Sequence, residues 1–310
     1  MAYVGIQKQI SKNNRNSAIM LLAFPAVMLA MVYLFMLATT YETYTTPWEE
    51  FLKAAPWVLA LTAIWFFVAW NFNVAMINAA TGSRTLERKE NKRIYNLVEN
   101  LCIANGMPMP KVNVIEDDSL NAFASGINNR TYTVSLSRGI INRLNDDELE
   151  GVIAHELVHI RNRDVRLLII SIIFVGIFAF IANMAMRSFH FSAFSRSRDN
   201  KNSAPIILLI MLLAGLAYLI SILLRFGISR SREYMADAGA AEMTRKPWAL
   251  ASALRKISGD PRIEAVENRD VAQMFIENPQ LSDDKSFSLS SVFATHPPIQ
   301  KRISLLEQFA

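Results

Sequence analysis

Two histidines and a glutamate stand in the pattern His155-Glu156-x-x-His159. Side chains four residues apart share one face of a helix, so both imidazoles can reach one Zn²⁺ ion if this segment is helical. Glu156 follows the first histidine directly, which places its carboxylate beside the water to be activated, as a general base. The alternative is that two surface histidines have this spacing by chance. It is weaker, because the chain has only four histidines. The pattern predicts a zinc hydrolase.

Two histidines leave a catalytic zinc site short of one protein ligand, because such sites keep three protein ligands and one open position. The best candidate is Glu233, and Asp237 lies one helical turn further along the same face. The carboxylate of Asp237 could accept the second ring N–H of a ligand histidine and fix its orientation. An acidic helix face paired with Arg230 and Arg232 explains the same spacing equally well, so spacing alone leaves both interpretations open.

The residues around these motifs predict the helices that they need. Asn145, with Glu148 three residues on, forms a capping-box pattern ahead of the histidine motif. The stretch 229–258 is helical in pattern, and another helix is expected after Pro297-Pro298. Between them, 259–291 is predicted to be a polar surface loop with a helical piece around 271–276.

Short strands are predicted upstream of the histidine motif. Lys111–Ile115 has the pattern of a strand, and Asn121–Ser125 pairs with Tyr132–Leu136 in a hairpin pattern around a turn-rich connection. Before them, Thr85–Ala104 has the pattern of an amphipathic helix. This region therefore predicts a small soluble part that mixes helices and strands.

The composition indicates that this soluble part belongs to a membrane protein. Hydrophobic residues make up 52% of the chain and charged residues 19%, with a mean hydropathy of +0.21. Four apolar segments are long enough to cross a bilayer, which takes about 20 residues: Ala18–Leu37, Trp57–Ala80, Leu167–Met186 and Ile206–Leu224. They divide the chain into a membrane hairpin (1–80), a catalytic part (81–166), a second hairpin (167–224) and a second catalytic part (225–310).

Lysines and arginines flank these segments and predict that the N-terminus and both catalytic parts are cytoplasmic. The loop between the third and fourth segments is also basic, so a shallow hairpin remains an alternative to a full crossing. One ion bound by both His159 and Glu233 would require the chain to leave and re-enter the same side of the membrane, which favours the full crossing. The net charge is +5, but the basic residues do not form the cluster that a nucleic-acid-binding surface needs. Cys102 is the only cysteine, which excludes an intrachain disulfide.

The His155–His159 motif is followed by Arg232-Glu-Tyr-Met-Ala-Asp-Ala-Gly-Ala240 and then by Thr295-His-Pro-Pro298 before the last helix. In this order and spacing, over almost the whole chain, the sequence resembles the HtpX family of membrane zinc metalloproteases, with the CAAX prenyl proteases as more distant relatives. The resemblance implies an α+β, gluzincin-type catalytic domain carried by four transmembrane helices. It implies one zinc ion per chain, held by His155, His159 and Glu233, with Glu156 as the base.

The resemblance also implies roles for residues outside the metal ligands. The edge strand of a small antiparallel sheet would lie beside the motif helix and bind extended peptide through its backbone, with the residues Asn121, Ala122, Phe123 and Ala124. His296 would stabilise the oxyanion. Arg302 would orient His296 or hold a neighbouring carboxylate.

The implied activity is ATP-independent cleavage of misfolded or damaged membrane proteins in the bacterial inner membrane under stress, with the active site facing the cytoplasm. The expected partners are protein substrates, mainly membrane proteins, the lipid bilayer, and other membrane quality-control proteases with which the enzyme would cooperate. A scaffold or transporter with structural zinc is disfavoured, because such zinc usually has four protein ligands, often cysteines. A CAAX-type processing protease would use the same residues and stays open, although its relatives carry more membrane helices.

Overall fold

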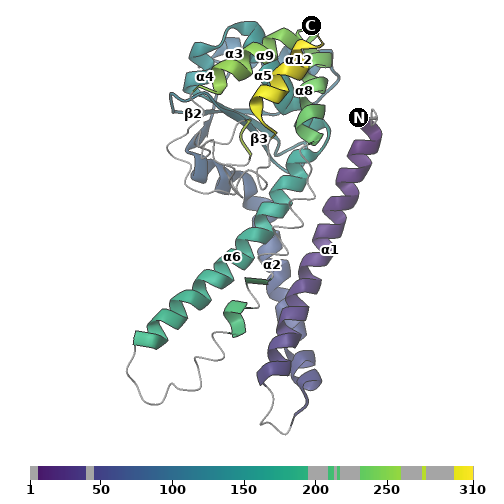
Figure 1. The fold of residues 1–310 in the computed structure, drawn as a ribbon, viewed down its shortest axis with the longest axis vertical. Helices are drawn as coiled ribbons and strands as arrows, with labels where there is room; N and C mark the ends of the chain where they lie inside the picture. The colour runs from purple at the N-terminus through teal and green to yellow at the C-terminus, as the bar shows by residue number, and fades with distance from the viewer. Residues whose placement is uncertain are drawn as a thin grey trace. The chain divides into compact units, whose positions relative to one another are not determined.

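The computed structural model describes residues 6–39, 45–194, 209–212, 215–216, 231–259, 274–276 and 297–309 (Figure 1). The chain forms two compact units. The sheet unit comprises Met1–Asn14, Phe72–Ile169 and Ile228–Ala310, and the helix unit comprises Arg15–Asn71 and Ile170–Gly227. Three long helices contribute residues to both units: α1 (Ile6–Thr39), α2 (Pro47–Thr81) and α6 (Asp164–Phe194).

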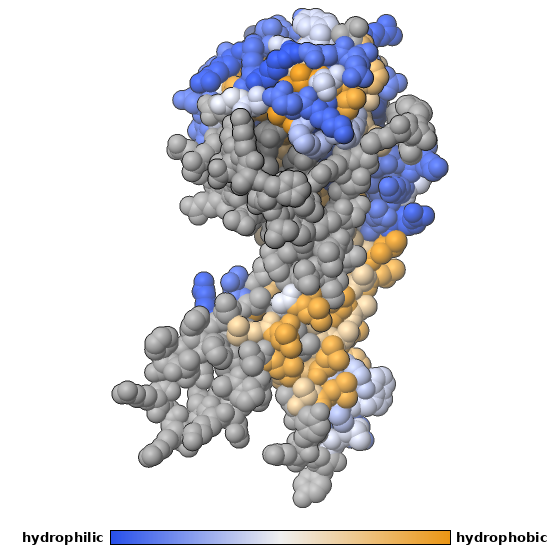
Figure 2. Space-filling view, in the orientation of Figure 1, coloured by the Kyte–Doolittle hydropathy of each residue, from blue (hydrophilic) through white to orange (hydrophobic). Residues whose placement is uncertain are grey.

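Within the described part of the chain, two helices have the length and composition to cross a membrane. They are Gln7–Ala38 and Pro47–Thr81, and the most apolar 18-residue windows of the two have mean hydropathies of 2.4 and 1.8. Only 11% and 0% of their most apolar windows are buried, so most of these apolar side chains face outward, as lipid contact requires (Figure 2). They contain the first two predicted segments. The third lies within α6, and most of the fourth lies outside the described residues.

The sheet is mixed, with the strand order β1-β2-β4-β3. Its strands are β1 (Ser83–Thr85), β2 (Lys111–Ile115), β3 (Ala122–Ser125) and β4 (Thr133–Ser137). β3 and β4 form the predicted antiparallel hairpin. The prediction of an antiparallel sheet is wrong, because β2 and β4 pair in parallel. The hairpin places β3 at the outer edge, so β4 returns between β2 and β3 and runs in the direction of β2.

The predicted helix Thr85–Ala104 begins later than expected. Ser83–Thr85 forms β1 and pairs antiparallel with β2, while α3 spans Lys92–Ala104. The side chain of Asn91 accepts a hydrogen bond from the backbone N–H of Ile94, which caps the helix at this point. The cap and the pairing with β2 therefore outweigh the helical periodicity of the residues before Lys92.

The histidine motif lies on α5 (Asp146–Arg161), whose start is a capping box as predicted. The N–H of Glu148 bonds Asn145 at 2.9 Å, and the N–H of Asn145 bonds Glu148 at 3.0 Å. α5 contacts β3 on one side and the helices α3, α8 (Ser231–Thr244) and α9 (Pro247–Ile257) on others (Figure 1). A helix surrounded in this way holds its side chains in fixed positions.

The predicted helix 229–258 is two helices in the described residues. α8 ends at Thr244, Arg245 takes a left-handed φ of 56°, and Pro247 begins α9. Proline favours the first turn of a helix and disfavours its interior. The last predicted helix is present as α12 (Ile299–Glu307), directly after Pro298.

Met274, Phe275 and Ile276 are buried, contrary to the prediction of a helical piece in a surface loop. Phe275 forms an antiparallel bridge with Phe123 of β3, and the N–H of Ile276 donates to the carbonyl of Ala122 at 2.8 Å. The rings of Phe123 and Phe275 pack edge-to-face at 4.7 Å. The outer edge of β3 is therefore paired with this segment of the same chain.

Candidate metal centre

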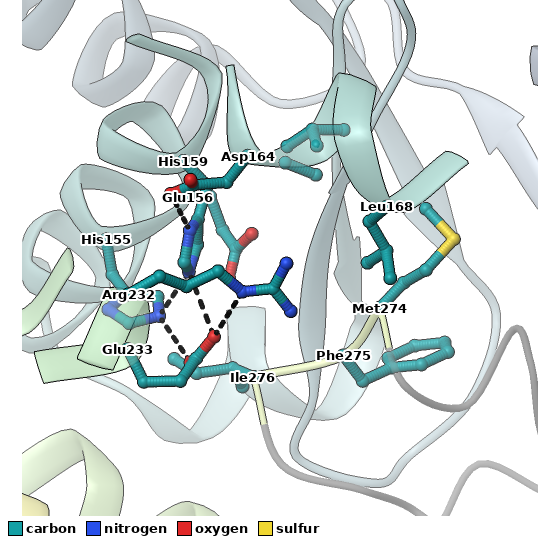
Figure 3. A pocket seen from close by; sticks show the side chains of 12 residues that line it. His155, Glu156, His159, Asp164, Leu168, Arg232, Glu233, Met274, Phe275 and Ile276 are labelled. Atoms are coloured by element: carbon teal, nitrogen blue, oxygen red, sulfur yellow. Dashed lines mark hydrogen bonds and ion pairs between the residues drawn. The ribbon is translucent and has the colours of Figure 1, made fainter. Parts of the chain in front are cut away.

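Two helices bring three metal-binding side chains together. His155 and His159 come from α5 and Glu233 from α8, and their ligand atoms all lie within 4.8 Å of one another. The two Nε2 atoms are 3.1 Å apart, and each lies 3.7 Å from an oxygen of Glu233 (Figure 3). Two imidazole nitrogens and one carboxylate are the donor set of catalytic zinc sites that keep one position open. The residues therefore fit a zinc ion.

A carboxylate braces the ring of His155 on the side away from the other ligands. Asp237 lies 3.0 Å from Nδ1 of His155, and Arg302 holds this carboxylate through two hydrogen bonds of 2.9 and 2.8 Å. Burial by itself would raise the pKa of Asp237, but the Arg302 guanidinium and His155 lower it to about 2. The ionised carboxylate favours a proton on Nδ1, which leaves the Nε2 lone pair free for a metal.

Asp164 braces the second histidine in the same way, and the sequence analysis did not identify it. Its Oδ2 lies 3.1 Å from Nδ1 of His159. Burial opposes a charged imidazole, yet the negative charges of Glu233 and Asp164 raise the pKa of His159 to about 10. The surroundings of this ring therefore favour a positive charge. Asp164 follows the motif by five residues at the start of α6, but only the turn between α5 and α6 directs it back to His159.

The general-base candidate lies in the same pocket. Glu156 is buried, and this burial raises the pKa of its carboxyl group, while the two histidines act in the opposite direction. A carboxylate with raised proton affinity is suited to taking a proton from water. The rest of the pocket is mainly apolar, with Ala124, Val165, Leu168, Met274, Phe275 and Ile276 on its walls.

Comparison with known proteins agrees with this geometry. The model of peptidase family M48 matches residues 88–310. A protease HtpX homologue from Bacteroides fragilis is 58% identical over all of both chains, and one from Lactobacillus helveticus is 33% identical over 98% of this chain and 99% of that chain. The chain belongs to peptidase family M48, among its HtpX proteases. It is a metallopeptidase.

The chain is also similar to a solved structure. The crystal structure of S. mikatae Ste24p aligns with a TM-score of 0.48 and 21% sequence identity, over 96% of this chain and 66% of that chain.

An HtpX homologue from Dictyoglomus turgidum is 43% identical over 73% of this chain and 72% of its own length.

The remaining predicted site residues of this metallopeptidase are placed unevenly. Of the four edge-strand residues, only Ala124 lines the pocket, and Ala122 and Phe123 bond the 274–276 segment. Arg302 holds the carboxylate of Asp237, one of the two roles considered for it. His296 lies outside the described residues.

One of the two interpretations left open by the spacing makes Arg232 a partner of an acidic helix face, but its side chain is buried beside the candidate ligands. Its Nε lies 3.4 Å from Oε1 of Glu233, and its guanidinium group points into the pocket (Figure 3). This places a positive charge in the pocket beside the candidate metal ligands. Its position next to Glu233 in the sequence does not predict this, because consecutive side chains of a helix point in different directions.

Proposed function

We propose that this metallopeptidase is an ATP-independent zinc endopeptidase of the bacterial inner membrane that cleaves misfolded or damaged membrane proteins. The observation that supports the zinc chemistry most directly is the convergence of His155, His159 and Glu233 within 4.8 Å, with Glu156 in the same pocket. The apolar walls of that pocket suit the hydrophobic side chains that a misfolded membrane protein exposes.

In the proposed mechanism His155, His159 and Glu233 would hold a zinc ion, which would act as a Lewis acid toward the scissile carbonyl and the attacking water. Glu156 accepts the proton of the attacking water and returns it to the leaving amine. Asp237 and Asp164 keep the Nε2 atoms of the two histidines directed at one point. We assign stabilisation of the developing oxyanion to His296, on the resemblance, with Arg232 as a second positive group.

The substrate is proposed to pair as an extended strand with β3, at the residues Asn121–Ala124. Because Phe275 and Ile276 already pair with Phe123 and Ala122, an incoming peptide would have to displace this segment or bind beside it at Ala124. Backbone pairing is tolerant of sequence, which fits an enzyme that acts on many damaged proteins.

The proposed topology has four membrane-spanning segments and a cytoplasmic active site. The basic residues flanking the segments support it, as do the two apolar helices of the described chain. A reporter fused near residue 200 should then read as periplasmic or membrane-embedded. Cytoplasmic accessibility at that position would instead favour a shallow hairpin.

The function is tested on the full-length protein purified in detergent with zinc. Wild type should cleave an unfolded substrate such as casein, whereas Glu156→Gln should lose this activity and still bind zinc. Glu233→Ala should lose zinc, and Glu242→Ala, an exposed glutamate on the same helix, serves as its matched control. Equal cleavage by wild type and Glu156→Gln would contradict the mechanism, and a wild type without zinc would contradict the metal centre.

A further inference from the structure

The N-terminal end of α1 belongs to the sheet unit and contacts the turn between α5 and α6. Asn13 is only 3% exposed. Its Nδ2 donates to the carbonyl of Asn162 at 2.8 Å and to Oδ1 of Asp164 at 2.5 Å. Residue 13 precedes the part of the chain that matches the family, 88–310, so the family match gives it no role.

Hydrogen-bond chemistry fixes the orientation of this amide. A carbonyl and an ionised carboxylate can only accept, so the group that faces them has to be the NH₂ of Asn13. The oxygen of Asn13 accepts from Nε2 of Gln9 at 3.3 Å. The amide of this buried side chain therefore donates two hydrogen bonds and accepts one, which holds it in one orientation.

The turn that Asn13 contacts is unfavourable by itself. Arg163 has a φ of 61°, and a left-handed conformation in a residue with a side chain costs about 1 kcal/mol or more. Such turns persist when neighbouring contacts hold them. Asn13 holds the residues on both sides, and Asn14 accepts from the guanidinium of Arg163 at 3.0 Å. Two adjacent residues of α1 thus contact all three residues of the turn 162–164.

The same turn directs Asp164 at the metal centre. Oδ1 of Asp164 receives the amide of Asn13, and Oδ2 lies 3.1 Å from Nδ1 of His159. The carboxylate of Asp164 contacts both side chains, so a substitution of Asn13 would alter the position of the His159 imidazole through Asp164. His159 in turn presents Nε2 to the position that His155 and Glu233 share.

We propose that Asn13 is a positioning residue of the metal centre, which acts by holding Asp164 against His159. The beginning of the first apolar helix is then part of the catalytic apparatus as well as an anchor. This inference rests on the proposed function in one respect, namely that His155, His159 and Glu233 hold zinc. Groups that orient metal ligands typically change metal affinity or activity by about 10- to 100-fold when they are removed.

The test compares metal retention in full-length variants in detergent. Zinc-loaded wild type, Asn13→Ala and Asn16→Ala are mixed with excess chelator, and the rate of zinc release is followed. Asn16→Ala is the same substitution about one turn further along α1. We expect Asn13→Ala to release zinc about 10-fold faster than wild type, with Asn16→Ala unchanged. With Co²⁺ as the probe, the visible absorption spectrum should change in Asn13→Ala and not in Asn16→Ala.

A second pair of variants keeps the test decisive if Asn13→Ala folds poorly. Asn13→Asp places two carboxylates at hydrogen-bond distance and should weaken zinc retention further. Adding Asp164→Asn restores a donor and an acceptor between residues 13 and 164 and returns the total charge to that of wild type. Zinc retention should therefore recover in part, while the carbonyl of Asn162 stays without its amide donor. Wild-type release rates and Co²⁺ spectra in Asn13→Ala, or no recovery in the exchanged pair, would overturn the inference while the zinc site itself stood. A wild type that holds no zinc would instead refute the proposed function.

Discussion

Gly239 of α8 allows the two ligand-bearing helices to approach each other. A Cβ atom at this position would lie 2.9 Å from both Cγ atoms of Val158 on α5. Carbon atoms prefer separations of about 3.5–4.0 Å, so Gly239→Ala would push the helices apart by about 0.6 Å. Metal sites tolerate deviations of about 0.2 Å in ligand distance. Glu233 on α8 would then no longer match His155 and His159 on α5.

The sign of the stability change in Gly239→Ala shows whether the space beside Gly239 is filled or free. Alanine is favoured over glycine in a helix by about 1 kcal/mol, so Gly239→Ala would stabilise the protein if the space were free. Overpacking costs about 1–3 kcal/mol, because the β-branched Val158 has little freedom to turn away. We therefore expect a net loss of about 1 kcal/mol and a zinc-release rate at least about 10-fold above wild type.

A compensating substitution separates packing from metal binding. Val158→Ala removes the two methyl groups that the new Cβ would meet, at a cost of about 2 kcal/mol in lost burial. The double variant Val158→Ala/Gly239→Ala should therefore regain zinc retention without regaining full stability. Thermal unfolding and chelator competition on the four proteins provide both measurements. If Gly239→Ala were more stable than wild type and held zinc equally well, the close approach of α5 and α8 would not control the site.

Three further substitutions test other contacts. Arg302→Met removes the guanidinium partner of the buried Asp237 carboxylate and should cost about 3–5 kcal/mol, measured by thermal unfolding. Adding Asp237→Asn should recover part of this loss, and strictly additive losses would show that the two groups act separately. Phe275→Ala removes a ring that packs on Phe123 at 4.7 Å. If segment 274–276 competes with the substrate, casein cleavage at low substrate concentration should rise several-fold; a fall would show that the segment supports substrate binding instead. Asn145→Ala should lower the stability by about 1 kcal/mol through the lost cap and leave zinc retention unchanged, since the cap lies about three turns from the histidine motif.

The metal centre was largely predictable because its strongest signals are local. His155 and His159 are one helical turn apart, and the capping box at Asn145 identifies the helix that carries them. Glu233 could be named from sequence, although spacing alone did not separate a ligand from an ordinary acidic face. The structure favours the ligand, because the carboxylate of Glu233 lies within 4.8 Å of the ligand atoms of both histidines.

The missed features all depend on contacts between distant parts of the chain. The alternating pattern of β2 and β4 predicts strands but not that they pair in parallel. The residues Met274–Ile276 pair with β3 far earlier in the chain. Asp164 faces His159 only because Arg163 adopts a left-handed conformation. Periodicity reports how a segment folds locally, and it carries no information on which distant segment will satisfy its backbone and side-chain groups.

The buried charges of the site suit a divalent ion. Of the charged side chains that line the described pocket or contact its histidines, four are carboxylates and two are guanidinium groups: Glu156, Asp164, Glu233, Asp237, Arg232 and Arg302. With all six ionised, the cluster has two negative charges in excess, and buried charges are costly unless they are balanced. A proton on His159, whose pKa is raised to about 10, supplies one positive charge. A divalent cation that displaces this proton supplies both, so the charge balance favours the metal over the proton.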